Sequence, residues 1–68
     1  MPYWTNDDLP PSVRDRLPSH AQDIYRAAFN IAFEEYTADP YQEETAHQVA
    51  WAAVKREYVS VRGRWMPR

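Results

Sequence analysis

The sequence of 68 residues contains no cysteine, which excludes both a disulfide bond and a metal site with thiolate ligands. The same absence fits a protein of the reducing cytoplasm. No run of apolar residues approaches the roughly 20 that a helix needs to cross a bilayer. Residues 1–8 lack the basic segment and the apolar core of a signal peptide. We therefore expect a cytoplasmic protein without a transmembrane segment.

The sequence also lacks the short motifs that mark common active sites. It has no glycine-rich phosphate loop, no nucleophile elbow and no zinc-protease motif. The acidic pairs Asp7-Asp8 and Glu43-Glu44 lack the ligand spacing of a calcium loop. We therefore expect no catalytic residue, no cofactor and no metal ion, and we predict that the protein is not an enzyme. An enzyme that uses Glu57 and His20 at a small cleft ranks last, because no nucleophile accompanies them.

Glycine is scarce, with one residue, whereas six prolines divide the chain into helical segments. Pro10 and Pro11 favour the first turn of a short helix, which Pro18 ends. Ser19 can cap a second helix through a capping box with Gln22, and this helix is predicted to run over about residues 20–36.

A third helix is predicted to start at Asp39 as the N-cap, with Pro40 as its first residue. It is predicted to end near Val59 or Ser60. Because only a short link separates it from the second helix, we expect an antiparallel helical hairpin.

The second helix has an apolar and a polar face. The apolar face comprises Ala21, Ile24, Tyr25, Ala28, Ile31, Ala32 and Tyr36, and the polar face comprises Asp23, Arg26, Asn30 and Glu34. The short aromatic ends of the chain, residues 2–4 and 64–66, would pair as two strands if the termini meet. The predicted fold is mainly α, with one short helix, two long helices in an antiparallel hairpin and a small two-stranded terminal β-sheet.

Two polar residues, His47 and Glu57, lie on or near the apolar side of the third helix. They are ten residues apart, about 15 Å along the axis, so they cannot form an acid–base pair within it. Antiparallel pairing places Glu57 near Ser19 and His20, where a carboxylate would meet free backbone N–H groups. It places His47 near Asn30.

We therefore interpret Ser19, His20, His47 and Glu57 as structural polar residues. For Glu57 this is favoured over a catalytic role, and Glu57→Ala is predicted to lower thermal stability. For His47 a metal-binding or pH-sensing role ranks well below a packed position at the core edge.

The C-terminal segment is the one stretch with the composition of a binding site. Arg62, Arg64 and Arg68 alternate with Trp65, and such residues can bind phosphates, acidic peptides or a membrane surface. In the alternative interpretation, which we favour, Trp65 closes the small core while the arginines stay in solvent.

The sequence resembles the ChaB family of proposed cation transport regulators. Three blocks carry the resemblance: Met1-Pro2-Tyr3; Leu9-Pro10 with Leu17-Pro18-Ser19-His20-Ala21-Gln22-Asp23-Ile24-Tyr25 and Ala28-Phe29-Asn30; and residues 43–58. The resemblance implies that residues 1–68 form a single ChaB-like domain of three helices with a small sheet. It also implies a cytosolic accessory protein that regulates a sodium(calcium)/proton antiporter.

Two departures from the family bear on this expectation. Some members carry a longer, charged linker between the long helices, where this chain has only residues 37–42. Their tails are rich in lysine, whereas this chain ends in Arg-Trp-Met-Pro-Arg. A partner that contacts the linker or the tail would therefore differ for this chain.

The leading hypothesis is a non-enzymatic protein-interaction module that resembles an antiporter regulator. The alternative is a nucleic-acid-binding accessory protein that uses Arg62, Arg64, Trp65 and Arg68 of the tail. A net charge of −2 argues against general electrostatic binding to nucleic acid, so this alternative ranks second.

Overall fold

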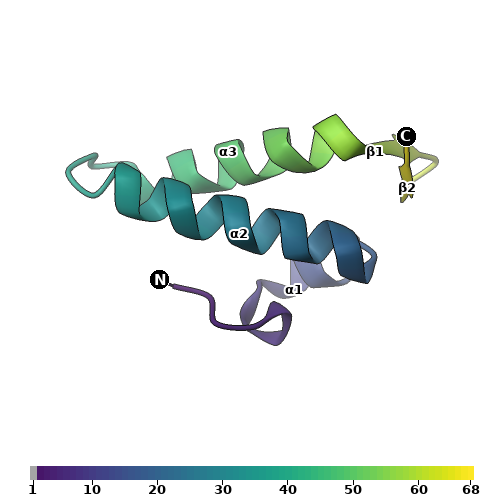
Figure 1. The fold of residues 1–68 in the computed structure, drawn as a ribbon, viewed down its shortest axis with the longest axis horizontal. Helices are drawn as coiled ribbons and strands as arrows, with labels where there is room; N and C mark the ends of the chain where they lie inside the picture. Colours follow the sequence, from purple (N-terminus) through teal and green to yellow (C-terminus); the bar gives the residue numbers. More distant parts are fainter. Residues whose placement is uncertain (1) are drawn as a thin grey trace.

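The computed structural model describes residues 2–68, and two long antiparallel helices dominate it (Figure 1). A short 3-10 turn, η1 (Asn6–Asp8), and a short helix, α1 (Pro11–Arg14), precede the long helices α2 (Ser19–Glu35) and α3 (Gln42–Glu57). Two strands, β1 (Tyr58–Val61) and β2 (Arg64–Pro67), complete the chain. The predicted fold class, mainly α with a helical hairpin and a two-stranded sheet, is confirmed. Met1, part of the first family block, lies outside the described residues.

The core lies between α2 and α3 and is closed on one side by the segment around α1. Its buried residues are Leu9, Val13, Leu17, Ala21, Tyr25, Phe29, Ala32, Ala46, Ala50, Val54 and Tyr58. Alanines on both long helices let the two backbones approach closely, while Tyr25 and Phe29 supply large buried surfaces. Burial of such aromatic area is what a short chain without disulfides needs for stability.

The helix starts differ in detail from the sequence expectation. Pro18, not Ser19, is the N-cap of α2, and the Gln22 side chain donates instead to the carbonyl of Leu17 at 2.8 Å. Helix α3 starts at Gln42, after an N-cap at Tyr41. Asp39 accepts a hydrogen bond from the Tyr41 N–H at 2.8 Å. Its carboxylate also accepts from the Thr45 hydroxyl at 3.3 Å, so it stabilises the turn before α3 and contacts the first turn of the helix.

The sheet is a local hairpin at the C-terminus, so the prediction that the two termini pair is wrong. Tyr58 pairs with Pro67 and Val61 with Arg64, in antiparallel register. The segment before η1 instead lies beside α2, away from the hairpin (Figure 1). A local turn closes a much shorter loop than a pairing of the chain ends, and its entropic cost is lower.

A two-residue turn, Arg62-Gly63, makes this hairpin possible. Both residues have positive φ, 54° for Arg62 and 81° for Gly63. Two positive φ angles in a two-residue loop match the right-handed twist of the flanking strands. Because Tyr58 already belongs to β1, α3 ends at Glu57 and not at the predicted Val59 or Ser60.

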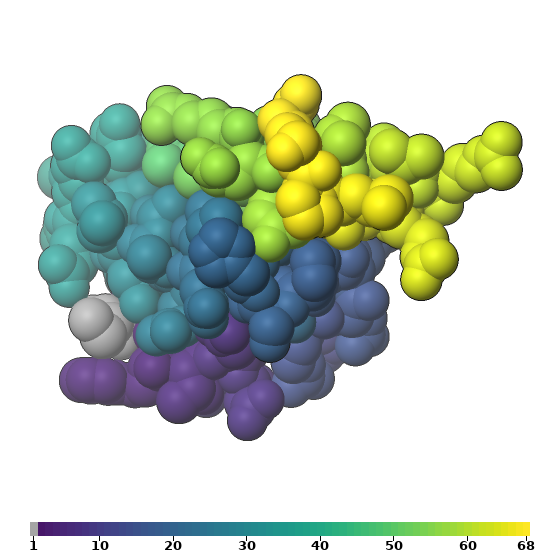
Figure 2. All heavy atoms as spheres, turned by 45° about the vertical axis from the view of Figure 1, so that its right-hand side comes forward, coloured from purple at the N-terminus to yellow at the C-terminus, as the bar shows by residue number. Residues whose placement is uncertain are grey.

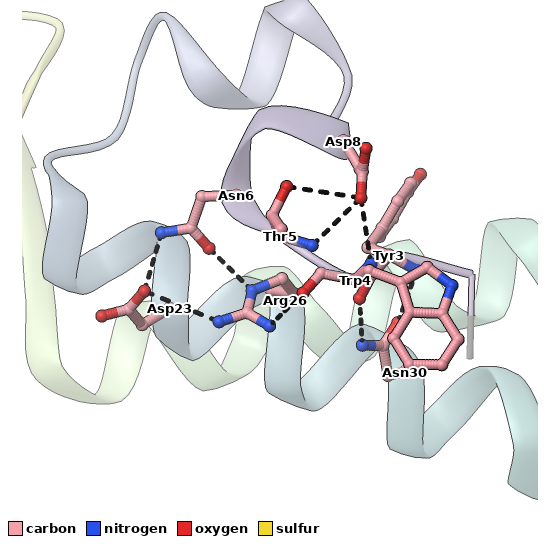
Figure 3. A network of polar contacts seen from close by, with 8 residues as sticks. All are labelled: Tyr3, Trp4, Thr5, Asn6, Asp8, Asp23, Arg26 and Asn30. Atoms are coloured by element: carbon pink, nitrogen blue, oxygen red, sulfur yellow. Dashed lines mark hydrogen bonds and ion pairs between the residues drawn. The ribbon is translucent and has the colours of Figure 1, made fainter.

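The polar face of α2 binds the N-terminal segment (Figure 3). The Asn30 side chain accepts from the Tyr3 N–H at 3.1 Å and donates to the Tyr3 carbonyl at 2.8 Å. The Arg26 guanidinium donates to the Asn6 side chain at 2.7 Å and to the Trp4 carbonyl at 3.1 Å. Two residues of the predicted polar face, Arg26 and Asn30, therefore bind the backbone of a segment that has little regular structure.

Within residues 2–68 no helix is long and apolar enough to cross a membrane.

Candidate functional site

The turn of the C-terminal hairpin carries the most prominent positive charge of the C-terminal segment. Arg62 and Arg64 flank Gly63, and both arginines are exposed. The turn projects from the body of the molecule in the space-filling view (Figure 2). Positive φ at Arg62 and Gly63 reverses the chain within two residues, so both arginines stand at the tip of a short hairpin.

The other two residues predicted for this site lie differently. Trp65 is half-buried, with its ring centroid 5.5 Å from that of Trp51, whose ring in turn meets Tyr25 edge-on at 5.1 Å. Arg68 is exposed, but its Nε donates to the Lys55 carbonyl at 2.8 Å. Trp65 and Arg68 therefore attach the hairpin to the core and to the end of α3, which leaves Arg62 and Arg64 as the free charges.

A shallow hollow of about 350 Å³ lies beside the hairpin. Its lining residues are Pro18, Tyr58, Arg64, Trp65, Met66 and Pro67. Most of this surface is apolar, and Arg64 brings a positive charge to it. Such a hollow can take an apolar side chain of a partner while the arginines meet a neighbouring acidic group.

His47 lies at the edge of the core, where its Nδ1 is hydrogen-bonded to the Tyr25 hydroxyl. Burial raises the pKa of Tyr25, so the phenol stays protonated and can donate to Nδ1. The imidazole also packs on the Phe29 ring, with centroids 4.6 Å apart, and its Nε2 lies 3.8 Å from the exposed carboxylate of Glu43. The predicted neighbour Asn30 is not its partner, because Asn30 binds Tyr3 on another side of α2.

Glu57 is exposed. The sequence had indicated a position on the apolar side of the helix, and this prediction is wrong. The residue that enters the core beside the start of α2 is Tyr58, whose hydroxyl lies 3.0 Å from Nδ1 of His20. The helical periodicity ends at Glu57 and the chain becomes extended at Tyr58, which turns this ring inward. Ser19 is exposed in the first turn of α2.

These polar residues do not assemble a reaction centre. His20 and Glu57 share a region, but Glu57 faces solvent, and His47 lies elsewhere along α3. No group of three or more histidine or carboxylate side chains in residues 2–68 is placed to hold a metal ion. Sequence reasoning missed the Tyr25–His47 contact. The signal was a tyrosine in the middle of an apolar helix face, since its buried hydroxyl requires a partner.

The comparisons with known proteins agree on one family. The sequence profile of the ChaB family matches residues 9–68. The chain is 59% identical over 64 residues to the Escherichia coli K12 protein named "Putative cation transport regulator ChaB", which covers 85% of this chain and 84% of that protein. A relative of the same name from Shigella flexneri has the same identity and coverage.

A more distant relative comes from a virus. It is the "Uncharacterized 10.9 kDa protein in LEF8-FP intergenic region" of Lymantria dispar multicapsid nuclear polyhedrosis virus, 38% identical over 60 residues. That match covers 88% of this chain and 58% of the viral protein.

A solved structure has the same fold. The solution structure titled "NMR solution structure of the putative cation transport regulator ChaB" is 50% identical in sequence and superposes with a TM-score of 0.88. It covers 98% of this chain and 99% of its own. On the profile, the sequence identity and the fold together, the chain belongs to the ChaB family.

Proposed function

We propose that this protein regulates cation transport without catalysing a reaction, by binding a protein partner in the cytosol. The observation that carries the proposal is the 59% identity to proteins named as cation transport regulators. The partner that best fits this role is a sodium(calcium)/proton antiporter of the membrane. Regulation through binding needs an exposed recognition surface and no reaction centre, and the described residues fit that requirement.

The C-terminal hairpin is the proposed docking element. Arg62 and Arg64 project at its turn, and the apolar hollow beside it includes Trp65 and Met66. Interfaces gain specificity from charge complementarity and affinity from apolar side chains that enter pockets. The expected contact on the partner is therefore an acidic, cytosol-facing loop that also carries one bulky apolar side chain.

The test is antiport in everted membrane vesicles that contain the antiporter. Added protein is expected to change the initial rate of Na⁺/H⁺ or Ca²⁺/H⁺ exchange, and the double variant Arg62→Glu/Arg64→Glu is expected to lose the effect. For either single reversal, Arg62→Glu or Arg64→Glu, the matched control is Arg16→Glu, which has the same change of charge at an exposed position away from the hairpin. Exchange rates that are the same with and without the protein would refute the regulatory role.

The same variants separate this proposal from binding to nucleic acid. Of the four tail residues, Arg68 is bonded to the Lys55 carbonyl, and Trp65 packs on Trp51, which leaves little of its ring for base stacking. We therefore expect no gel shift with DNA or RNA at moderate salt. A shift that weakens steeply as salt rises and disappears in Arg62→Glu/Arg64→Glu, with no effect on transport, would favour the nucleic-acid role instead.

A further inference from the structure

An apolar groove between α2 and α3 is not covered by any other described element. Only residues of these two helices line it: Ala28, Ile31, Ala32 and Glu35 from α2, and Val49, Ala52, Ala53 and Arg56 from α3. Its volume is about 390 Å³. Two of its apolar side chains are well exposed, Ile31 at 67% and Val49 at 37%. The groove is therefore apolar surface that the monomer leaves in contact with water.

The two helices contribute to the groove with the same spacing. On each helix the lining residues follow positions i, i+3, i+4 and i+7, which form one stripe two turns long. On α2 the stripe runs from Ala28 to Glu35, and on α3 it runs from Val49 to Arg56. Each stripe thus begins with an apolar residue and ends with a charged one.

The antiparallel register places the two charges at opposite ends of the groove. Ring contacts between Tyr25 and Trp51 and between Phe29 and His47 bring the middle of α2 beside the middle of α3. From this centre Glu35 lies about 10 Å toward the interhelical link, and Arg56 lies about 10 Å toward the β-hairpin. Neither side chain forms an ion pair with another described residue.

We propose that this groove binds a second copy of the chain, and that the two copies form a symmetric antiparallel dimer with Glu35 of each copy paired to the Arg56 position of the other. In a face-to-face dimer the two-fold axis lies in the plane of the interface. A two-fold axis perpendicular to the groove makes the grooves of the two copies run in opposite directions. Each Glu35 then lies at the end of the groove where the other copy has its Arg56. The small side chains at the centre let the helices of the two copies pack closely around the two isoleucines.

Charge excludes the other symmetric arrangement. An axis along the groove places the Glu35 side chains of the two copies side by side, and likewise the two Arg56 side chains. Like charges in contact are unfavourable. The same self-complementary pattern favours a second copy over an unrelated partner, because both ends of the groove are satisfied at once. This interaction is independent of the hairpin, so it goes beyond the proposed function and leaves Arg62 and Arg64 free.

The size of the groove sets the strength of the dimer. It is about 20 Å long, and it offers less surface than the roughly 800 Å² that each partner buries in a standard interface. We therefore expect a weak, reversible dimer that is populated only at high protein concentration. Sedimentation velocity over a series of protein concentrations measures it directly.

Two charge reversals and their mixture form the decisive experiment. Glu35→Arg alone and Arg56→Glu alone place like charges at both ends of the dimer, and each is expected to weaken it by roughly ten-fold. An equimolar mixture of the two variants restores opposite charges at both ends and is expected to dimerise again as a heterodimer. A matched control uses Arg16→Glu and Glu44→Arg, which are exposed and lie outside the groove, and whose dimerisation is expected to equal that of the unmodified chain.

A chain that stays monomeric up to millimolar concentration would overturn the proposal. A dimer that both reversals leave unchanged would overturn it too, because it would have to use another surface. A mixture that dimerises no better than the separate variants would refute the antiparallel pairing. Circular dichroism of each variant checks that the exposed substitutions keep the helical fold.

Discussion

The hydroxyl of Tyr25 and Nδ1 of His47 are hydrogen-bonded across the interface of α2 and α3, although 22 positions separate the two residues. Tyr25 is fully buried, and His47 is half-buried beside it. The pair joins the two long helices in the middle of the core, where Trp51 packs on Tyr25 and Phe29 packs on His47.

Tyr25→Phe removes the hydroxyl and keeps the ring, so it isolates the contribution of this hydrogen bond. The expected loss of unfolding free energy is about 1 kcal/mol, because Nδ1 of His47 loses its partner in a site that water reaches only partly. Urea denaturation at pH 7 measures the difference. Tyr36→Phe is the control, since the Tyr36 ring is exposed, and its stability is expected to be unchanged. Equal stability of Tyr25→Phe and the unmodified chain would contradict the structural role of this contact.

The same tyrosine predicts a loss of stability at high pH. Burial raises the pKa of Tyr25 above the ordinary value of 10.0. The folded protein therefore keeps the phenolic proton at pH values where the unfolded chain has released it. The contribution is complete below pH 10 and is lost as pH rises from there through the folded-state pKa.

Urea midpoints measured from pH 8 to pH 11 test this dependence. The unmodified chain is expected to lose stability above pH 10 more steeply than Tyr25→Phe. The comparison cancels the titration of Lys55 and of the other tyrosines, which both proteins share. Parallel curves for the two proteins would contradict a raised pKa of Tyr25.

The sequence predicted the features of this fold that depend on local chemistry. Prolines lie at or just before the helix starts, although α3 begins at Gln42 and not at Pro40, and helical periodicity identifies the apolar face that includes Tyr25. The short link between the long helices implies their antiparallel packing, which the structure confirms.

The features that were missed depend on contacts between distant parts of the chain. Asn30 was assigned to the polar face of α2 and placed near His47, because nothing local shows that Tyr3 will need its side chain. Glu57 fell on the apolar arc because a helical wheel does not show where the neighbouring helix stops or that Tyr58 turns inward. The pairing of β1 with β2 depends on positive φ at Arg62, which is uncommon for arginine and has no clear sequence signal.

Asn30→Ala is expected to release the N-terminal segment from α2. The side chain makes two hydrogen bonds with the backbone of Tyr3 and is 7% exposed, so its loss leaves an N–H and a carbonyl without partners. The expected cost is about 2 kcal/mol of unfolding free energy. Hydrogen exchange at the Tyr3 amide should accelerate more than exchange in α3. Gln48→Ala, at an exposed position of α3, is the control and is expected to change neither quantity.

Gly63→Ala is expected to destabilise the hairpin without affecting the helices. A Cβ at this position meets no atom within 4 Å, so the effect is conformational, from the φ of 81°. Placing a residue with a side chain in this left-handed region costs about 1 kcal/mol. Amide exchange should accelerate in β1 and β2 while exchange in the centre of α2 stays unchanged. Ser60→Ala keeps an exposed strand position and serves as the control; a hairpin equally stable in both variants would contradict the role of Gly63.

Glu57 and Tyr58 are adjacent, yet the structure predicts opposite consequences for their substitution. The carboxylate of Glu57 is exposed, so Glu57→Ala is expected to change the unfolding free energy by less than about 0.5 kcal/mol, in contrast to the sequence-based prediction of a loss. Tyr58 is 4% exposed and packs near the start of α2, so Tyr58→Ala is expected to cost about 3 kcal/mol. Tyr58→Phe keeps the ring and separates packing from the contact with His20, which should account for about 1 kcal/mol. Thermal melts of the three variants rank their losses of stability. A larger loss of stability for Glu57→Ala than for Tyr58→Phe would restore the interpretation of Glu57 as a buried structural acid.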